Sequence, residues 1–191
     1  MSLVGISVLW WSTDGFSAFT TETARRLDIL HSPRPLPATV LEDQDGHLFR
    51  LQDYRGRFVA VEFIYTRCTT LCRSLGMAFK QIRDRVPQQA LDRDLAMVSI
   101  SFDTERDDLP SLKAYGQTYG ADGTHWRIAR VRNAAELKPL LKTFGIVVIP
   151  DGLGGFEHNA AIHLLGRDGR LTQIIDISDP LQFADRIATW H

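Results

Sequence analysis

One stretch of the 191-residue chain, Phe58 to Tyr65 (FVAVEFIY), restricts the fold more than any other. It is nearly all β-branched, aromatic or otherwise apolar, which is typical of a central strand covered on both faces. Thr66 to Cys72 then leads into a helical pattern that continues through Arg83. Strands with one solvated face alternate apolar and polar residues, and this strand does not. A strand covered on both faces and followed at once by a helix favours an α/β fold, in which helices cover the sheet.

The same alternation of strand and helix continues along the chain. A second apolar strand is expected over Leu95 to Phe102, and a third over Trp126 to Val131. Helical patterns at Leu109 to Tyr119 and Ala134 to Phe144 alternate with them. This order predicts an α/β sheet that contains parallel strand pairs.

Asp-Gly pairs, which favour tight hairpin turns, lie on either side of this region. Asp45-Gly46 separates two short strands and predicts an N-terminal hairpin extension. Asp168-Gly169 joins strands expected over His158 to Leu165 and Leu171 to Ile177, which would close the sheet with an antiparallel edge. Asp179-Pro180 then predicts the start of a terminal helix. The elements together predict an α/β, thioredoxin-like fold, with a central mixed sheet flanked by helices.

Length and composition favour a single compact domain. A chain of 21.6 kDa with 44% hydrophobic residues can bury one full core and is short for two. A helical pattern over Asp14 to Leu30 gives way to a segment with prolines at 33, 35 and 37, which favours an extended linker. We therefore expect a membrane-proximal segment and linker over residues 1–35 and the domain over residues 36–191.

The apolar run Val4 to Trp11 (VGISVLWW) allows three interpretations. It is too short to span a bilayer, which takes about 20 residues. It could form a core strand, an interfacial segment with its tryptophans at headgroup depth, or the outer end of a membrane anchor. Charge excludes one class of partner: 22 Lys and Arg stand against 23 Asp and Glu, and the basic residues are scattered, so nucleic acid binding is not expected.

The chain has two cysteines, Cys68 and Cys72, placed directly after the first central strand. Residues four apart share a helix face, so two thiols there can converge on one partner atom or on each other. A helix N-terminus also lowers the pKa of a thiol and favours the thiolate. The pattern therefore indicates either a soft-metal site, for Cu(I) or zinc, or a dithiol/disulfide couple.

A histidine near the two sulfurs would complete a three-ligand set suited to copper in either oxidation state. His158 is the best of the six histidines, because it follows a glycine-rich stretch that could carry it onto the sulfurs. His163, five residues further on, would face the opposite side of an unbroken strand. The others have ordinary surroundings in the sequence; they are His31, His47, His125 and His191.

The motifs resemble the Sco family in three stretches: FIYTRCTTLC from Phe63, SISFDTERD from Ser99 and EHNAAIHLLGRDGRL from Glu157. This resemblance runs over residues 36 to 190 and keeps the order and spacing of the parts. Members have a thioredoxin-like fold, bind copper, and help assemble the copper A centre of cytochrome c oxidase. The segment from Trp10 to Arg26 also resembles the stretch that follows the single membrane anchor of bacterial members.

The resemblance implies a metal site made of Cys68, Cys72 and His158, which match the family's copper-binding residues. Its metal would be copper, as Cu(I) or Cu(II). Asp103 and Asp107 match an acidic pair that lies near the metal in the family. Alternatively, those two residues form a turn and cap the helix that starts at Leu109.

Three positions depart from the family pattern. Arg73 replaces a proline directly after the second cysteine, which changes local stiffness and charge. An adjacent guanidinium stabilises thiolates and would favour redox exchange as well as metal capture. Glu157 replaces the usual aspartate before the histidine, and Thr104 replaces a common proline.

These residues, together with the resemblance, imply two alternative functions. In the first, the chain is a copper-binding assembly factor, not an enzyme, that delivers copper to subunit II of cytochrome c oxidase or to another copper protein. In the second, Cys68 and Cys72 are catalytic residues of a thiol-disulfide oxidoreductase that reduces the cysteines of the oxidase copper site. A peroxidase ranks below both, because no Pro-x-x-x-Thr-x-x-Cys arrangement is present. The resemblance also implies a monomeric domain, anchored by its N-terminus on the periplasmic side of a bacterial inner membrane.

Overall fold

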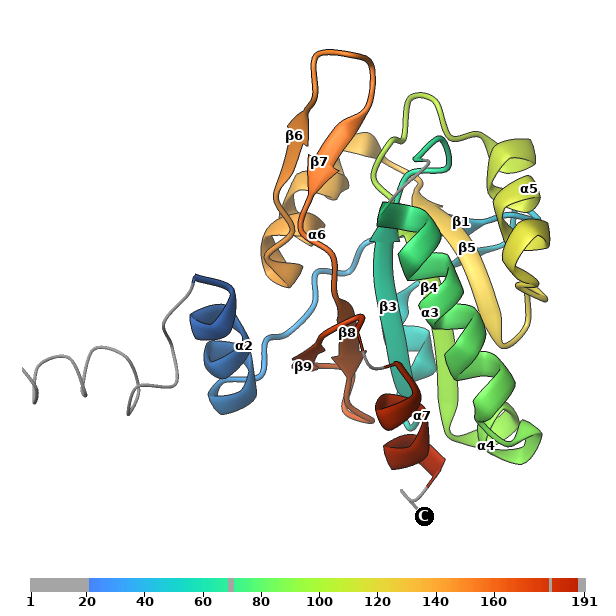
Figure 1. Cartoon of the computed structure of the whole chain (residues 1–191), viewed down its shortest axis with the longest axis vertical. Coiled ribbons are helices and arrows are strands. Elements are labelled where there is room, and N and C mark those ends of the chain that lie inside the picture. Colours follow the sequence, from blue (N-terminus) through green and yellow to red (C-terminus); the bar gives the residue numbers. More distant parts are fainter. Residues whose placement is uncertain (1–20, 69–70, 179, 189–191) are drawn as a thin grey trace, which may run out of the picture.

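The computed structural model describes residues 21–68, 71–178 and 180–188 (Figure 1). These residues form a seven-stranded sheet of order β2-β1-β5-β4-β3-β8-β9 and a separate two-stranded sheet, β6-β7. The strands are β1 Leu41–Asp43, β2 Leu48–Phe49, β3 Phe58–Ile64, β4 Leu95–Ser101, β5 Trp126–Val131, β6 Val148–Pro150, β7 Phe156–His158, β8 Ile162–Leu165 and β9 Leu171–Ile175. The helices are α2 Thr21–His31, α3 Leu71–Arg85, α4 Gln88–Arg93, α5 Leu109–Tyr119, α6 Leu137–Phe144 and α7 Pro180–Ala188, with short 3-10 turns at Leu51–Tyr54 and Ala134–Glu136.

The centre of the sheet is parallel, as the strand-helix alternation predicted. β3 pairs with β4 along its whole length, from Phe58 opposite Leu95 to Ile64 opposite Ser101. β4 pairs in parallel with β5, and all of its residues are buried. Because both central strands are covered on both faces, their sequences need no alternation of apolar and polar residues. The expected mixed α/β fold is confirmed.

Helices cover both faces of the sheet. On one face, Phe79 of α3 packs against Trp126 of β5, with ring centroids 5.6 Å apart. On the other, Phe144 of α6 packs against Phe63 of β3, at 5.0 Å. Successive strand residues point to opposite faces, so Glu62, next to Phe63, lies on the α3 face. This carboxyl is fully buried in a mostly apolar layer, where the buried hydroxyl of Ser99 is its hydrogen-bond partner.

Both hairpins predicted from Asp-Gly pairs are present. β1 pairs antiparallel with β2 at one edge of the sheet, and β8 pairs antiparallel with β9 at the other edge. α5 has the predicted bounds, Leu109–Tyr119. α3 extends from Leu71 to Arg85, two residues beyond the predicted end at Arg83. Cys68, which precedes it, is not part of this helix. The short helix α4 was not expected from the sequence.

One predicted strand is wrong. Residues from His158 to Leu165 do not form a single strand: β7 ends at His158, and β8 begins at Ile162. β7 pairs antiparallel with β6 in a separate hairpin, Val148 lying opposite His158, whereas β8 pairs with β3. The glycine-rich stretch is therefore the tip of a β-hairpin that projects beyond the end of the main sheet (Figure 1). The pair Asp151-Gly152 carried the same hairpin signal as the other two turns.

The segment before residue 36 packs on the domain. Of the helix expected over Asp14 to Leu30, the structure describes α2, whose Ile29 side chain is fully buried. Arg25 Nη1 donates hydrogen bonds to the carbonyl oxygens of Phe144 (2.6 Å) and Gly145 (3.2 Å) at the end of α6. After α2 the chain runs extended, and Arg34 forms an antiparallel bridge with Leu171 of β9.

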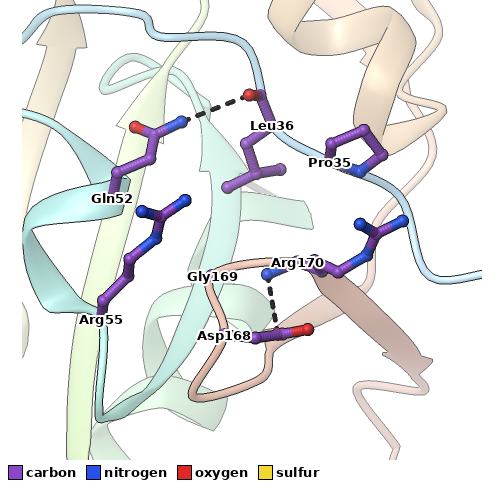
Figure 2. A pocket seen from close by; sticks show the side chains of 7 residues that line it. All are labelled: Pro35, Leu36, Gln52, Arg55, Asp168, Gly169 and Arg170. Carbon is purple, nitrogen blue, oxygen red and sulfur yellow. Dashed lines mark hydrogen bonds between the residues drawn. The ribbon is translucent and has the colours of Figure 1, made fainter.

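A pocket of about 300 Å³ lies where this extended segment crosses the β8-β9 turn (Figure 2). Gln52 Nε2 reaches across it and donates hydrogen bonds to the carbonyl oxygens of Leu36 (3.3 Å) and Pro37 (2.9 Å). Leu165, just before the turn, pairs near the amino end of β3, opposite Val59. The pocket therefore lies at the opposite end of the sheet from Cys68.

Two predictions from the sequence concern residues that the structure does not describe. Val4 to Trp11 and the proposed N-cap Asp179 both lie outside the described residues. Within residues 21–68, 71–178 and 180–188, no helix combines the length and the hydropathy that a membrane crossing requires.

Candidate metal and thiol site

Cys68 lies in the loop between β3 and α3, at the carboxyl end of the central parallel strands. Its backbone N–H donates to the carbonyl oxygen of Tyr65 at 3.2 Å, which makes a tight turn directly after the strand. α3 begins at Leu71, so Cys72 is the second residue of the helix. Cys68 is half-buried against the core, whereas the side chain of Cys72 is outside the described part of the structure.

A buried carboxylate holds the loop that leads to Cys68. Asp107 is fully buried and accepts hydrogen bonds from the backbone N–H (2.9 Å) and the hydroxyl (2.7 Å) of Thr66. It also accepts a hydrogen bond from the hydroxyl of Ser101, at the end of β4. Charge-assisted hydrogen bonds of this kind are about twice as strong as neutral ones. Asp107 thus ties the cysteine loop to the neighbouring strand.

The second acid, Asp103, joins two arginines. Its carboxylate lies 3.1 Å from Arg67 Nη2 and 2.7 Å from Arg106 Nε. Neither Asp103 nor Asp107 caps the following helix, because the N-cap of α5 is Asp108, whose side chain accepts from the N–H of Ser111. The capping interpretation was therefore assigned to the wrong aspartate.

His158 ends β7 and packs against aromatic side chains at the ends of the two central strands. Its ring centroid lies 5.0 Å from that of Phe102, after β4, and 6.4 Å from that of Tyr65, after β3. Phe156 completes the cluster at 5.3 Å from Tyr65 and 5.5 Å from Phe102. The hairpin therefore brings His158 to the same end of the sheet as Cys68.

The surroundings of His158 favour a neutral imidazole. Burial lowers its pKa below the ordinary value, and a hydrogen bond to the carbonyl oxygen of Asn159 offsets this only in part. Because a carbonyl oxygen can only accept, Nδ1 carries the proton at 3.2 Å from that oxygen. The lone pair is then on Nε2, so that atom has the electronic state of a metal ligand.

Hydrogen bonds between side chains and backbone groups fix the β6-β7 hairpin beside the cysteine loop. The hydroxyl of Tyr65 donates to the carbonyl oxygen of Phe156 and accepts from its N–H, both at 3.3 Å. At the base, the Asn159 side chain accepts from the N–H of Val147 (2.8 Å) and donates to the carbonyl oxygen of Gly145 (3.0 Å). At the tip, the Asp151 carboxylate accepts from two backbone N–H groups, those of Leu153 and Gly155.

His163 and His125 lie away from Cys68, although His163 is separated from His158 by a break in the strand and not by the alternation of an unbroken strand. His163 is fully buried between Phe63 and Phe144, and burial lowers its pKa to about 3. His125 bridges the carboxylates of Asp122 and Asp92, at 2.7 Å each, and the hydrogen bond to Asp122 raises its pKa.

Cys68 also borders a pocket of about 330 Å³ on the side of α5. Among its lining residues are Thr66, from the same loop, and Tyr115, from α5. The pocket offers a path by which another chemical group could approach the sulfur. Among the side chains that the structure describes, no three from His, Cys, Asp and Glu form a metal-binding group, and Cys72 is not one of those side chains.

Several residues at this end of the molecule were not identified from the sequence. Three aromatic residues have the sequence context of ordinary core residues; they are Tyr65, Phe102 and Phe156. The sequence around an aromatic residue at the end of a strand is the same whether the ring packs in the core or on a metal-binding side chain. Arg106 likewise had no signal of its own, because its hydrogen bond to the carbonyl oxygen of Gly154 joins segments 48 residues apart in the sequence.

Comparisons with known proteins identify a family and a shared fold. The SCO1/SenC family model matches residues 38–190. The SCO1 protein homolog of Bacillus subtilis is 26% identical over 132 residues, which cover 68% of this chain and 67% of that protein.

Two solved structures share the fold. Copper-bound ScoI of Bradyrhizobium japonicum has a TM-score of 0.71 and 22% identity, over 82% of this chain and 99% of that one. BsSco, described with a disulfide switch as a member of the Sco family of cytochrome c oxidase assembly proteins, has a TM-score of 0.67 and 20% identity, over 84% and 96% of the two chains. The family model spans most of the chain, from the first hairpin to the last helix, and the chain therefore belongs to the SCO1/SenC family.

Proposed function

We propose that this chain binds one copper ion through the thiolates of Cys68 and Cys72 and the imidazole of His158. The observation that carries this proposal is the packing of His158 on Tyr65 and Phe102, at the end of the sheet where Cys68 lies. Family membership and the copper-bound relative support it. Two soft sulfurs and one neutral nitrogen suit Cu(I), and the nitrogen extends the set to Cu(II).

The chain would act by delivering this copper to the copper A centre of cytochrome c oxidase. Copper is the cargo here, so no turnover is required. A shallow three-ligand site lets an incoming thiolate form a mixed intermediate before the ion leaves. The pocket beside Cys68 supports such an approach to the sulfur, and BsSco supports the assembly role.

The same cysteines support a second candidate, a thiol-disulfide oxidoreductase in which Cys68 attacks and Cys72 resolves. The specific observation that favours it is the position of both cysteines at the amino end of α3, where the helix dipole stabilises a thiolate. The exposed Arg73 adds positive charge beside them. In this reaction the imidazole of His158 would be dispensable.

The experiment that tests the metal site is an anaerobic Cu(I) titration of the reduced protein, followed by a Cu(II) titration. We expect about one copper per chain, lost in Cys68→Ala/Cys72→Ala. His158→Ala should weaken Cu(II) binding more than Cu(I) binding, because imidazole matters more to the harder ion. His125→Ala is the matched control and should bind copper as the wild type does. Equal stoichiometry and affinity in the double cysteine variant and the wild type would defeat the proposal.

A thiol-exchange assay with an oxidised copper A peptide separates the two candidates. The oxidoreductase requires that His158→Ala still reduces the peptide at the wild-type rate while it binds Cu(II) more weakly. Copper delivery requires instead that the loaded protein transfers copper to the reduced peptide and that His158→Ala, at the same Cu(II) concentration, transfers less of it.

We also propose that the domain works on the periplasmic side of a bacterial inner membrane, held by an N-terminal anchor. The apolar run Val4 to Trp11 supports the membrane association, because its tryptophan pair suits a membrane interface, and the periplasmic side follows from the family resemblance.

A further inference from the structure

Arg106, in the β4-α5 loop, bonds to the tip of the β6-β7 hairpin and to a carboxylate that also contacts the cysteine loop. Arg106 Nε lies 2.7 Å and 3.0 Å from the two carboxylate oxygens of Asp103. Its Nη1 donates a hydrogen bond of 2.7 Å to the carbonyl oxygen of Gly154, at the tip of the hairpin. The guanidinium carbon also lies 5.1 Å from the ring centroid of Phe156, two residues before His158.

The carboxylate that holds Arg106 is itself fixed. Asp103 is nearly fully buried and also pairs with Arg67, the residue before Cys68. Its backbone N–H donates to the hydroxyl of Ser101, which in turn donates to Asp107. Arg106 therefore extends to the hairpin the same polar network that fixes the cysteine loop. Its two anchors lie 51 residues apart in the sequence, from 103 to 154.

We infer that Arg106 is a positioning residue, which holds the β6-β7 hairpin, and with it His158, against the cysteine loop. The inference rests on the proposed copper site and goes beyond it, because Arg106 donates to the hairpin and is not itself a ligand. Partners that orient a metal ligand typically change metal affinity by about 10-fold to 100-fold when they are removed. The planar guanidinium suits the task, since separate nitrogens bind the carboxylate and the carbonyl at once.

Copper affinity of Arg106 variants tests this inference. Arg106→Ala should weaken Cu(II) binding by roughly 10-fold or more and leave Cu(I) binding near the wild-type value, because the thiolates dominate Cu(I). Arg106→Lys should show a similar loss, because one ammonium cannot hold both acceptors in this geometry. Arg93→Ala, which removes an exposed arginine on α4, is the control and should leave both affinities unchanged.

A double-mutant cycle distinguishes positioning from a general structural effect. If Arg106 acts through His158, Arg106→Ala/His158→Ala should bind Cu(II) no more weakly than His158→Ala alone. Full additivity of the two losses, or a Cu(II) affinity of Arg106→Ala equal to that of the wild type, would overturn the inference. Full restoration by Arg106→Lys would also overturn it, because charge alone would then suffice.

Backbone amide exchange in the metal-free protein gives a readout that does not depend on copper. Residues 152–158 should exchange faster in Arg106→Ala than in the wild type, while β3 and β4 exchange at unchanged rates. Unchanged exchange across the hairpin would overturn the inference. If the wild type itself binds no copper, the proposed function fails, and the exchange data still decide whether Arg106 holds the hairpin.

Discussion

At the residue scale, Asp107 is the side chain on which the cysteine loop depends most directly. It is a buried carboxylate that accepts two hydrogen bonds from Thr66 and one from Ser101. An amide in its place would keep the shape but lose the charge, and its NH₂ group would face hydrogen-bond donors. The position of Cys68, two residues after Thr66, is therefore set by a charge that lies in the neighbouring loop.

Asp107→Asn should lower the free energy of unfolding by about 2–3 kcal/mol, because hydrogen bonds to charged groups contribute about that much when buried. It should also weaken Cu(I) binding, since the loop would no longer hold Cys68 in place. Urea unfolding and copper titration measure the two effects. Glu105→Gln, an exposed acid in the same loop, is the control and should change neither. Wild-type stability of Asp107→Asn would contradict this role.

Glu62 makes the stability of the protein depend on pH. The carboxyl is fully buried on β3, and burial raises its pKa from 4.5 to about 8, partly offset by a hydrogen bond from the hydroxyl of Ser99. Ser99 in turn accepts a hydrogen bond of 2.8 Å from Trp126 Nε1. Between these two pKa values the folded protein keeps the proton and the unfolded chain releases it, so stability falls as pH rises.

Glu62→Gln has no proton to keep and should remove this dependence. The difference in unfolding free energy between the variant and the wild type should grow in favour of the variant from about pH 4.5 to about pH 8. The slope should approach about 1.4 kcal/mol per pH unit inside that window and vanish above it. Urea unfolding at several pH values measures the difference. A constant difference across the window would show that Glu62 is ionised in the folded protein.

At the element scale, the α2 helix tests where the domain begins. The sequence placed the start at residue 36, whereas α2 buries Ile29 and bonds to the end of α6 through Arg25. We propose that residues 36–191 fold without α2 but with less stability. Burying an isoleucine alone is worth about 2–5 kcal/mol by substitution with alanine.

A chain that starts at residue 36 should therefore unfold cooperatively, at a midpoint below that of the full chain. Ile29→Ala in the full chain should give part of the same loss, and Leu30→Ala, which changes an exposed side chain on the same helix, should give little. Thermal unfolding followed by circular dichroism measures all three. A truncated chain without a cooperative transition would place α2 inside the folding unit.

The sequence predicts elements well where the pattern is local. β3, β4 and α5 follow from unbroken apolar runs and helical spacing, which do not depend on distant partners. The β6-β7 hairpin was missed, because each of its two strands has three residues and a glycine-rich tip separates them. His158 was proposed as a ligand from its sequence context, but the aromatic side chains that pack on it, Tyr65 after β3 and Phe102 after β4, come from separate segments and needed the structure.

At the scale of the whole molecule, the fold places three chain segments at one end of the parallel strands. The cysteine loop follows β3, the Asp103–Asp107 loop follows β4, and the β6-β7 hairpin stands beside them at the same end of the sheet (Figure 1). Carboxyl ends of parallel strands gather at one edge of a sheet, where loops commonly carry function. The order of β3, β4 and the loops that follow them is readable from the sequence, whereas the hairpin and its contacts with the loops depend on side chains far apart along the chain.

X-ray absorption at the copper edge is the sharpest test of the three-ligand copper site, because it counts the atoms bound to the metal. We expect two sulfur ligands and one imidazole nitrogen in the wild-type protein loaded with one Cu(II), and two sulfurs without that nitrogen in His158→Ala. An unchanged nitrogen contribution in His158→Ala, or fewer than two sulfurs in the wild type, would contradict the three-ligand site.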